Sequence, residues 1–74
     1  MILKFEGIDN WSRPIFKDDK NNRYGATCQL FSYGTTGEEV IARLNPHELS
    51  YFGKGLGCEP SGTEFDTSNL TLLP

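Results

Sequence analysis

Apolar and polar side chains alternate along the first eight residues of the chain. Leu3 and Phe5 fall on one side of an extended backbone, whereas Lys4 and Glu6 fall on the other. A period of two is typical of a strand with one buried face. The pattern therefore predicts a first strand over residues 1–8.

The strongest structural signal is a hairpin over residues 13–31. Two runs rich in strand-forming residues flank a polar turn at residues 18–22. In the second arm, one set of alternate side chains is the more apolar and is expected to face the core. This set is Tyr24, Ala26, Cys28 and Leu30.

A short helix is predicted from about Gly37 to Leu44. Its signals are an apolar stripe (Val40, Ile41, Leu44), an acidic first turn (Glu38, Glu39) and a threonine that can cap its start (Thr35 or Thr36). The spacing also predicts an ion pair between Glu39 and Arg43. The β-branched pair Val40-Ile41 leaves a strand as the alternative for the same residues.

The rest of the chain adds strands to this framework. Asn45-Pro46 is typical of a helix start, and one helical turn followed by a strand over Leu49 to Phe52 is predicted. Residues 61–74 form either an edge strand or a loosely attached tail. Together these patterns predict a single α+β domain over residues 1–74, with a mainly antiparallel sheet of three to five strands and one short helix. A small all-β barrel of the SH3 type is the alternative.

Chain length and composition limit the classes of protein to which this chain can belong. A domain of 74 residues has a small core and a free energy of unfolding of about 3–5 kcal/mol. No apolar stretch approaches the ~20 residues of a membrane-spanning helix, and no leader-like segment follows Met1. A cytoplasmic protein is expected.

The charge distribution disfavours nucleic-acid binding. The net charge is −3; residues 1–25 carry five basic and four acidic residues, and the remainder carries two basic and six acidic residues. Phosphate recognition needs clustered Lys and Arg. A small nucleic-acid-binding module is kept as the alternative function, and it would use Lys4, Lys17, Lys20 and Arg23 around the hairpin.

The residues of a catalytic or metal site are scarce. His47 is the single histidine, and Cys28 and Cys58 lack a Cys-x-x-Cys spacing, so both cysteines are expected in the core. The glycine run at residues 53–57 resembles a phosphate loop, but Cys58-Glu59-Pro60 follows where a helix should begin. No enzyme, metal or cofactor is predicted.

Aromatic side chains are the remaining candidate for function. There are five Phe, three Tyr and one Trp, more rings than one face of a small sheet can bury. Either they form an aromatic core, which is favoured for Trp11, or some form an exposed surface of the kind that protein interfaces enrich. The candidate binding residues are Trp11, Arg13, Tyr24, Tyr33, Tyr51 and Phe52.

A pattern in the first third of the chain resembles a known group of proteins. The pattern is Gly7-x-Asp9-x-Trp11-x-Arg13-Pro14, then Phe16-Lys17-Asp18, with Cys58-Glu59-Pro60 further along. It resembles uncharacterised small proteins of phages and conjugative elements of Gram-positive and gut bacteria. The resemblance implies a cytoplasmic, non-enzymatic protein of a mobile element. Among the matching positions, Asp9 is expected to cap a turn, and Arg13 is expected to pair with Glu59.

These observations lead to one functional expectation. The chain is predicted to be a non-enzymatic accessory or regulatory protein of a phage or mobile element that binds a protein partner, with host-defence machinery among the candidates. Self-association into a homodimer through an unpaired edge strand is compatible with this function.

Overall fold

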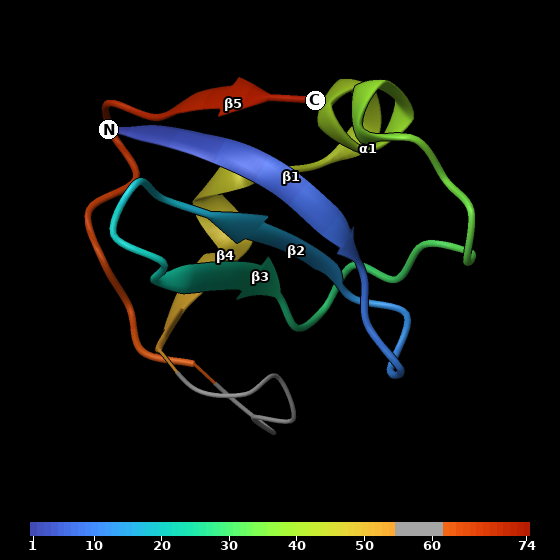
Figure 1. Ribbon diagram of the computed structural model, residues 1–74, viewed down its shortest axis with the longest axis horizontal. Helices are drawn as coiled ribbons and strands as arrows, with labels where there is room; N and C mark the ends of the chain where they lie inside the picture. Colours follow the sequence, from blue (N-terminus) through green and yellow to red (C-terminus); the bar gives the residue numbers. More distant parts are fainter. Residues whose placement is uncertain (55–61) are drawn as a thin grey trace.

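A five-stranded open sheet and one α-helix make up the fold. The computed structural model describes residues 1–54 and 62–74. The strands lie in the order β4-β3-β2-β1-β5, and all pairs are antiparallel except β1–β5. This arrangement confirms the α+β prediction and differs from the closed SH3-type barrel (Figure 1). The elements are β1 (Ile2–Ile8), β2 (Pro14–Lys17), β3 (Arg23–Ala26), α1 (Gly37–Arg43), the 3₁₀ turn η1 (Pro46–Glu48), β4 (Leu49–Gly53) and β5 (Thr71–Leu73).

The predicted hairpin is present, but its second arm is shorter than expected. β3 ends at Ala26, and the chain then leaves the sheet. Tyr24 and Ala26 are buried, whereas Cys28 and Leu30 are exposed, so the prediction that these two face the core is wrong. The reason is that a side chain alternates between faces only while its backbone stays in the sheet. Cys58 lies outside the described residues.

Asp18 organises the turn between β2 and β3. Its Oδ1 accepts hydrogen bonds from the backbone N–H groups of Lys20 (2.8 Å) and Asn22 (2.9 Å). Its Oδ2 accepts from the Asn22 side-chain amide and the Tyr24 hydroxyl, each at 3.0 Å. Burial by itself raises the pKa of Asp18, but these four bonds favour the charged form and hold the pKa at about 2.

The hydrogen bonds of Asp18 should make the free energy of unfolding depend on pH. The pKa of Asp18 is lower in the folded chain than the ~3.9 of an unfolded aspartate. Its stabilisation is therefore fully present above about pH 4 and is lost as the pH falls through about 2. We expect Asp18→Asn to lower the free energy of unfolding at neutral pH by about 1 kcal/mol after solvent screening. In urea titrations, this difference from the wild type should disappear toward pH ~2.

The neighbouring aspartate provides a matched control for this experiment. Asp19 is exposed and makes no hydrogen bond or ion pair within residues 1–54 and 62–74. Asp19→Asn should leave the pH dependence of unfolding unchanged. Equal effects of the two substitutions would contradict the role assigned to Asp18.

Helix α1 forms where it is predicted. The Thr36 hydroxyl accepts the N–H of Glu39, which caps the helix start. Residues Gly37–Arg43 are α-helical, so the strand alternative for this segment does not hold, and Val40 of the apolar stripe is fully buried. The predicted Glu39–Arg43 ion pair is absent among the described residues. The Arg43 guanidinium lies instead 5.2 Å from the centre of the Phe31 ring, an interaction comparable in strength to an exposed ion pair.

The last described segment joins the sheet as its edge strand. β5 pairs in parallel with β1, with Leu72 opposite Leu3. The amino group of Met1 donates to the carbonyl oxygen of Asn69 (2.8 Å), and the N–H of Thr71 donates to the carbonyl oxygen of Met1 (2.9 Å). The two ends of the chain therefore run side by side (Figure 1). Within residues 61–74, the edge strand consists of Thr71–Leu73.

The sheet has two different faces. One face packs against α1 and its flanking segments, and its buried cluster is Leu3, Phe16, Tyr24, Ala26, Phe31, Val40, Leu44 and Leu49. Because alternate strand residues point to opposite sides, a second set of side chains lies on the other face. We call this the outer face and define it by Ile2, Lys4, Glu6, Lys17 and Arg23. Within the described chain, no helix has the length and apolar character needed to span a bilayer.

Candidate functional site

The turn between β1 and β2 is braced by Asp9. Its Oδ1 accepts the backbone N–H groups of Trp11 (2.9 Å) and Arg13 (2.8 Å). Two backbone bonds close the same turn: Ser12 N–H to the Asp9 carbonyl and Asp9 N–H to the Arg13 carbonyl, each at 3.0 Å. Ser12 adopts a left-handed φ of 61°, which costs about 1 kcal/mol for a residue with a side chain. These bonds hold the turn in a conformation that it would otherwise avoid.

The Arg13 side chain is buried and has Asp9 as a counterion. Only 3% of Arg13 is exposed. Its Nη2 and Nε atoms both lie 2.7 Å from Asp9 Oδ2. A buried guanidinium needs a charged acceptor, because desolvation of an unpaired charge is costly. Glu59, the predicted partner of Arg13, lies outside the described residues.

Arg13 lies between two aromatic rings. Its guanidinium carbon is 4.6 Å from the centre of the Trp11 ring and 5.0 Å from that of Phe52. Phe52 in turn lies close over Gly25 in β3, where an added Cβ would be 2.6 Å from the ring. We call Trp11, Arg13 and Phe52 the Trp11 stack. It connects the exposed Trp11 ring to the sheet through Arg13, its near neighbour in sequence, and Phe52, which is distant in sequence.

Trp11 itself is exposed, so the prediction that it fills the core is wrong. Its exposed fraction is 49%. Its side chain leaves a turn beyond the end of β1, and the Arg13 guanidinium covers its ring in place of core hydrocarbon. The core face is filled by other large side chains, with Phe16 fully buried.

A second segment lies beside this turn. The N–H of Phe31 donates to the Ser12 carbonyl at 2.8 Å, and the Tyr33 hydroxyl donates to Asn10 Oδ1 at 3.3 Å. Leu30 and Tyr33 are 65% and 74% exposed. We call Trp11, Leu30 and Tyr33 the Trp11 surface.

Sequence reasoning did not include Leu30 in the site. The reason is that it extended the second hairpin arm to Phe31, which would have turned Leu30 inward. Nothing in the local sequence marks the end of β3 at Ala26.

The other two candidate aromatic residues lie on the core face. Tyr24 is 4% exposed, and its ring centre is 5.3 Å from that of Tyr51 and 4.9 Å from that of Phe65. The Tyr51 hydroxyl donates to Asn22 Oδ1 at 3.2 Å. Burial raises the pKa of Tyr24, and its bond to Asp18 raises it further, to about 12. The structure thus groups Trp11, Arg13 and Phe52 together and places Tyr24 and Tyr51 elsewhere.

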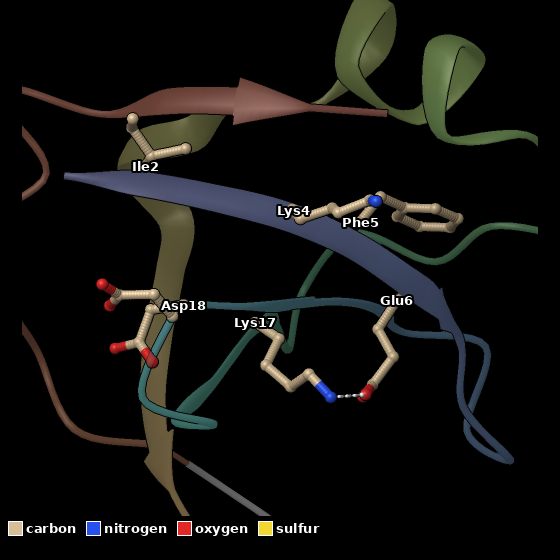
Figure 2. A pocket seen from close by; sticks show the side chains of 7 residues that line it. Ile2, Lys4, Phe5, Glu6, Lys17 and Asp18 are labelled. Carbon is tan, nitrogen blue, oxygen red and sulfur yellow. Dashed lines mark ion pairs between the residues drawn. The ribbon is translucent and has the colours of Figure 1, made fainter.

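Two of the four basic residues around the hairpin, Lys17 and Arg23, are paired with one acid. Glu6 binds both Lys17 (Nζ to Oε2, 3.2 Å) and Arg23 (Nε to Oε1, 2.8 Å), as Figure 2 shows for Lys17. The hydrogen bond from Arg23, aided by Lys17, holds the pKa of Glu6 below its ordinary value. A hollow of about 450 Å³ lies on this face, lined by Ile2, Lys4, Phe5, Glu6, Lys17, Asp18 and Asp19. With three acids and two bases, this lining does not favour a phosphate.

The candidate catalytic residues are not brought together in the described part of the chain. Nδ1 of His47 lies 3.1 Å from the Thr67 hydroxyl, and Cys28 is an exposed thiol. Within residues 1–54 and 62–74, no three His, Cys, Asp or Glu side chains are grouped to hold a metal ion. Most of the glycine run lies outside the described residues, as do Cys58 and Glu59.

Comparison with known protein families, with curated proteins and with solved structures finds no match to this chain.

Proposed function

We propose that this chain is a non-enzymatic protein-binding domain whose partner docks on the Trp11 surface. One observation carries the proposal: a half-exposed tryptophan is held in place by a braced turn and a buried arginine. A ring that served only to fill the core would not be exposed to this extent. Backbone strain at Ser12 in the same turn is of the kind that clusters at binding sites.

The physical properties of the Trp11 surface support a protein partner. Trp and Tyr supply most of the energy in many interfaces, and a pre-organised ring loses little conformational entropy on binding. The charge beneath the Trp11 ring, on Arg13, is balanced by Asp9, and the three side chains of the surface are themselves uncharged. The surface suits a partner that presents apolar side chains and an acceptor for the indole N–H. A polyanionic nucleic acid suits it poorly, because two of the three basic residues of the outer face, Lys17 and Arg23, are paired with Glu6.

The biological setting is a further part of the proposal. The pattern from Gly7 to Asp18 resembles that of small proteins of phages and conjugative elements. On that basis the domain would act as an accessory or regulatory protein of a mobile element, and a host protein would be its partner.

Trp11→Ala is expected to weaken partner binding at least 30-fold, the usual effect of removing a central aromatic contact. Leu30→Ala should weaken it by a smaller factor. The partner would first be captured by cross-linking to the full chain, and its affinity then measured with purified protein. Trp11 is the only tryptophan, so its fluorescence should also change as the partner saturates the surface.

Leu73→Ala is the matched control for Leu30→Ala. Leu73 is also an exposed leucine, at 42%, but it lies in β5 at the opposite edge of the sheet from β4. The Leu73→Ala variant should bind the partner with unchanged affinity. Unaltered affinity of Trp11→Ala, with its fold verified by circular dichroism, would refute the proposal.

A further inference from the structure

The outer face carries an exposed apolar residue beside two opposite charges. Ile2 is 61% exposed. Lys4 follows two residues later in β1, and therefore points to the same side of the sheet. Lys17 of β2 lies directly opposite Lys4 of β1, and the two strands are antiparallel. Asp19, two residues after Lys17, therefore lies at the level of Ile2, two residues before Lys4. All three side chains line the hollow of the outer face, part of which is shown in Figure 2.

The other charges around this hollow have partners. Glu6 binds Lys17 and Arg23, and the carboxylate of Asp18 accepts three hydrogen bonds within its own turn and one from the Tyr24 hydroxyl in β3. Lys4 and Asp19, in contrast, have neither an ion pair nor a side-chain hydrogen bond with any described residue. Lys4 also faces the like charge of Lys17 across the strand pair, which is unfavourable. A carboxylate brought to Lys4 would relieve this repulsion.

We propose that the occupant of this hollow is a second copy of the chain, in a dimer with two-fold symmetry. In such an interface, each contact between two different residues occurs twice. A surface with a cation and an anion on either side of an apolar residue is complementary to itself. Lys4 of each copy therefore faces Asp19 of the other copy, and the two Ile2 side chains are in contact.

This inference is independent of the proposed function. The dimer uses the start of β1 and the turn after β2, whereas Trp11 lies in the turn beyond the other end of β1. Trp11→Ala should therefore leave the dimer unchanged. A variant that loses partner binding but still dimerises, or that loses dimerisation but still binds the partner, distinguishes the two proposals.

Sedimentation equilibrium of the full chain should show a monomer that becomes a dimer between micromolar and millimolar concentration, as befits a small interface. Added salt should weaken the dimer, because exposed ion pairs are screened. Lys4→Glu and Asp19→Lys should each weaken it about tenfold or more, because each places like charges opposite each other twice. A mixture of the two variants should associate again, since each copy then supplies the charge that the other needs.

Two charge-matched variants serve as controls. Lys54→Glu and Glu38→Lys change the net charge by the same amounts, at exposed positions outside the hollow, and should dimerise like the wild type. A chain that stays monomeric at every concentration would overturn the proposal. So would a dimer that is insensitive to both reversals, or a mixture of the two variants that fails to associate. Capture of an unrelated protein at this face by a monomeric chain would also overturn it.

Discussion

Replacing Phe16 with alanine is expected to leave the chain largely unfolded at 25 °C. Phe16 is completely buried at the centre of β2 and packs edge-to-face against Phe5, with ring centres 5.6 Å apart. Loss of a buried phenylalanine costs about 3–5 kcal/mol, through lost transfer energy and the cavity that remains. This is about the whole stability of a domain of this size. Circular dichroism in a urea titration would show no folded baseline.

Leu30→Ala is the appropriate control, because it also removes a large apolar side chain. Leu30 is 65% exposed, so its truncation should change the free energy of unfolding by no more than about 0.5 kcal/mol. A cooperative transition for Phe16→Ala, with a midpoint near that of the wild type, would show that Phe16 does not hold the core together.

Asp9→Asn is expected to have the second largest effect, about 3 kcal/mol of lost stability. Asparagine retains one oxygen that can accept the N–H groups of Trp11 and Arg13. Its NH₂ group, however, would face the N–H donors of the buried Arg13 guanidinium, and the charge of the Asp9 carboxylate beside that guanidinium would be lost. Breaking one partner of a buried pair is far more costly than losing an exposed one.

This substitution should also change the environment of Trp11. Without the Asp9 brace the turn can relax, so the emission of the single tryptophan should shift to the red, and partner binding should weaken together with it. Asp66→Asn is the control, because Asp66 accepts the Ser68 N–H and hydroxyl in an exposed turn. An Asp9→Asn variant with wild-type stability and emission would contradict the role given to this pair.

Local patterns were sufficient for much of the fold. The helix was predictable because its determinants are adjacent in sequence: the Thr36 cap, an acidic first turn and an apolar stripe that includes Val40. The alternation in residues 1–8 predicted β1, and the polar run at residues 18–22 predicted the turn that Asp18 organises. These features depend on backbone preference and on side chains a few residues apart.

The candidate site was only partly predictable. Trp11, Arg13 and Phe52 were named as binding residues from their chemistry, but nothing indicated that they form one stack. Phe52 reaches Arg13 only because β4 pairs with β3 and a glycine at position 25 leaves room for the ring. Such contacts depend on strand order, which local patterns do not specify.

The sequence by itself determined the class of fold, the helix with its cap, the hairpin turn and the aromatic residues available for binding. Tertiary structure decided which of those aromatic residues are exposed. Tyr24 is buried because its side chain in β3 points to the face of the sheet that α1 covers. Trp11 is exposed because its turn lies beyond the end of β1, where the Arg13 guanidinium packs on its ring. The physical reason is that burial depends on which distant segments meet, whereas turn and helix formation depend on neighbours along the chain.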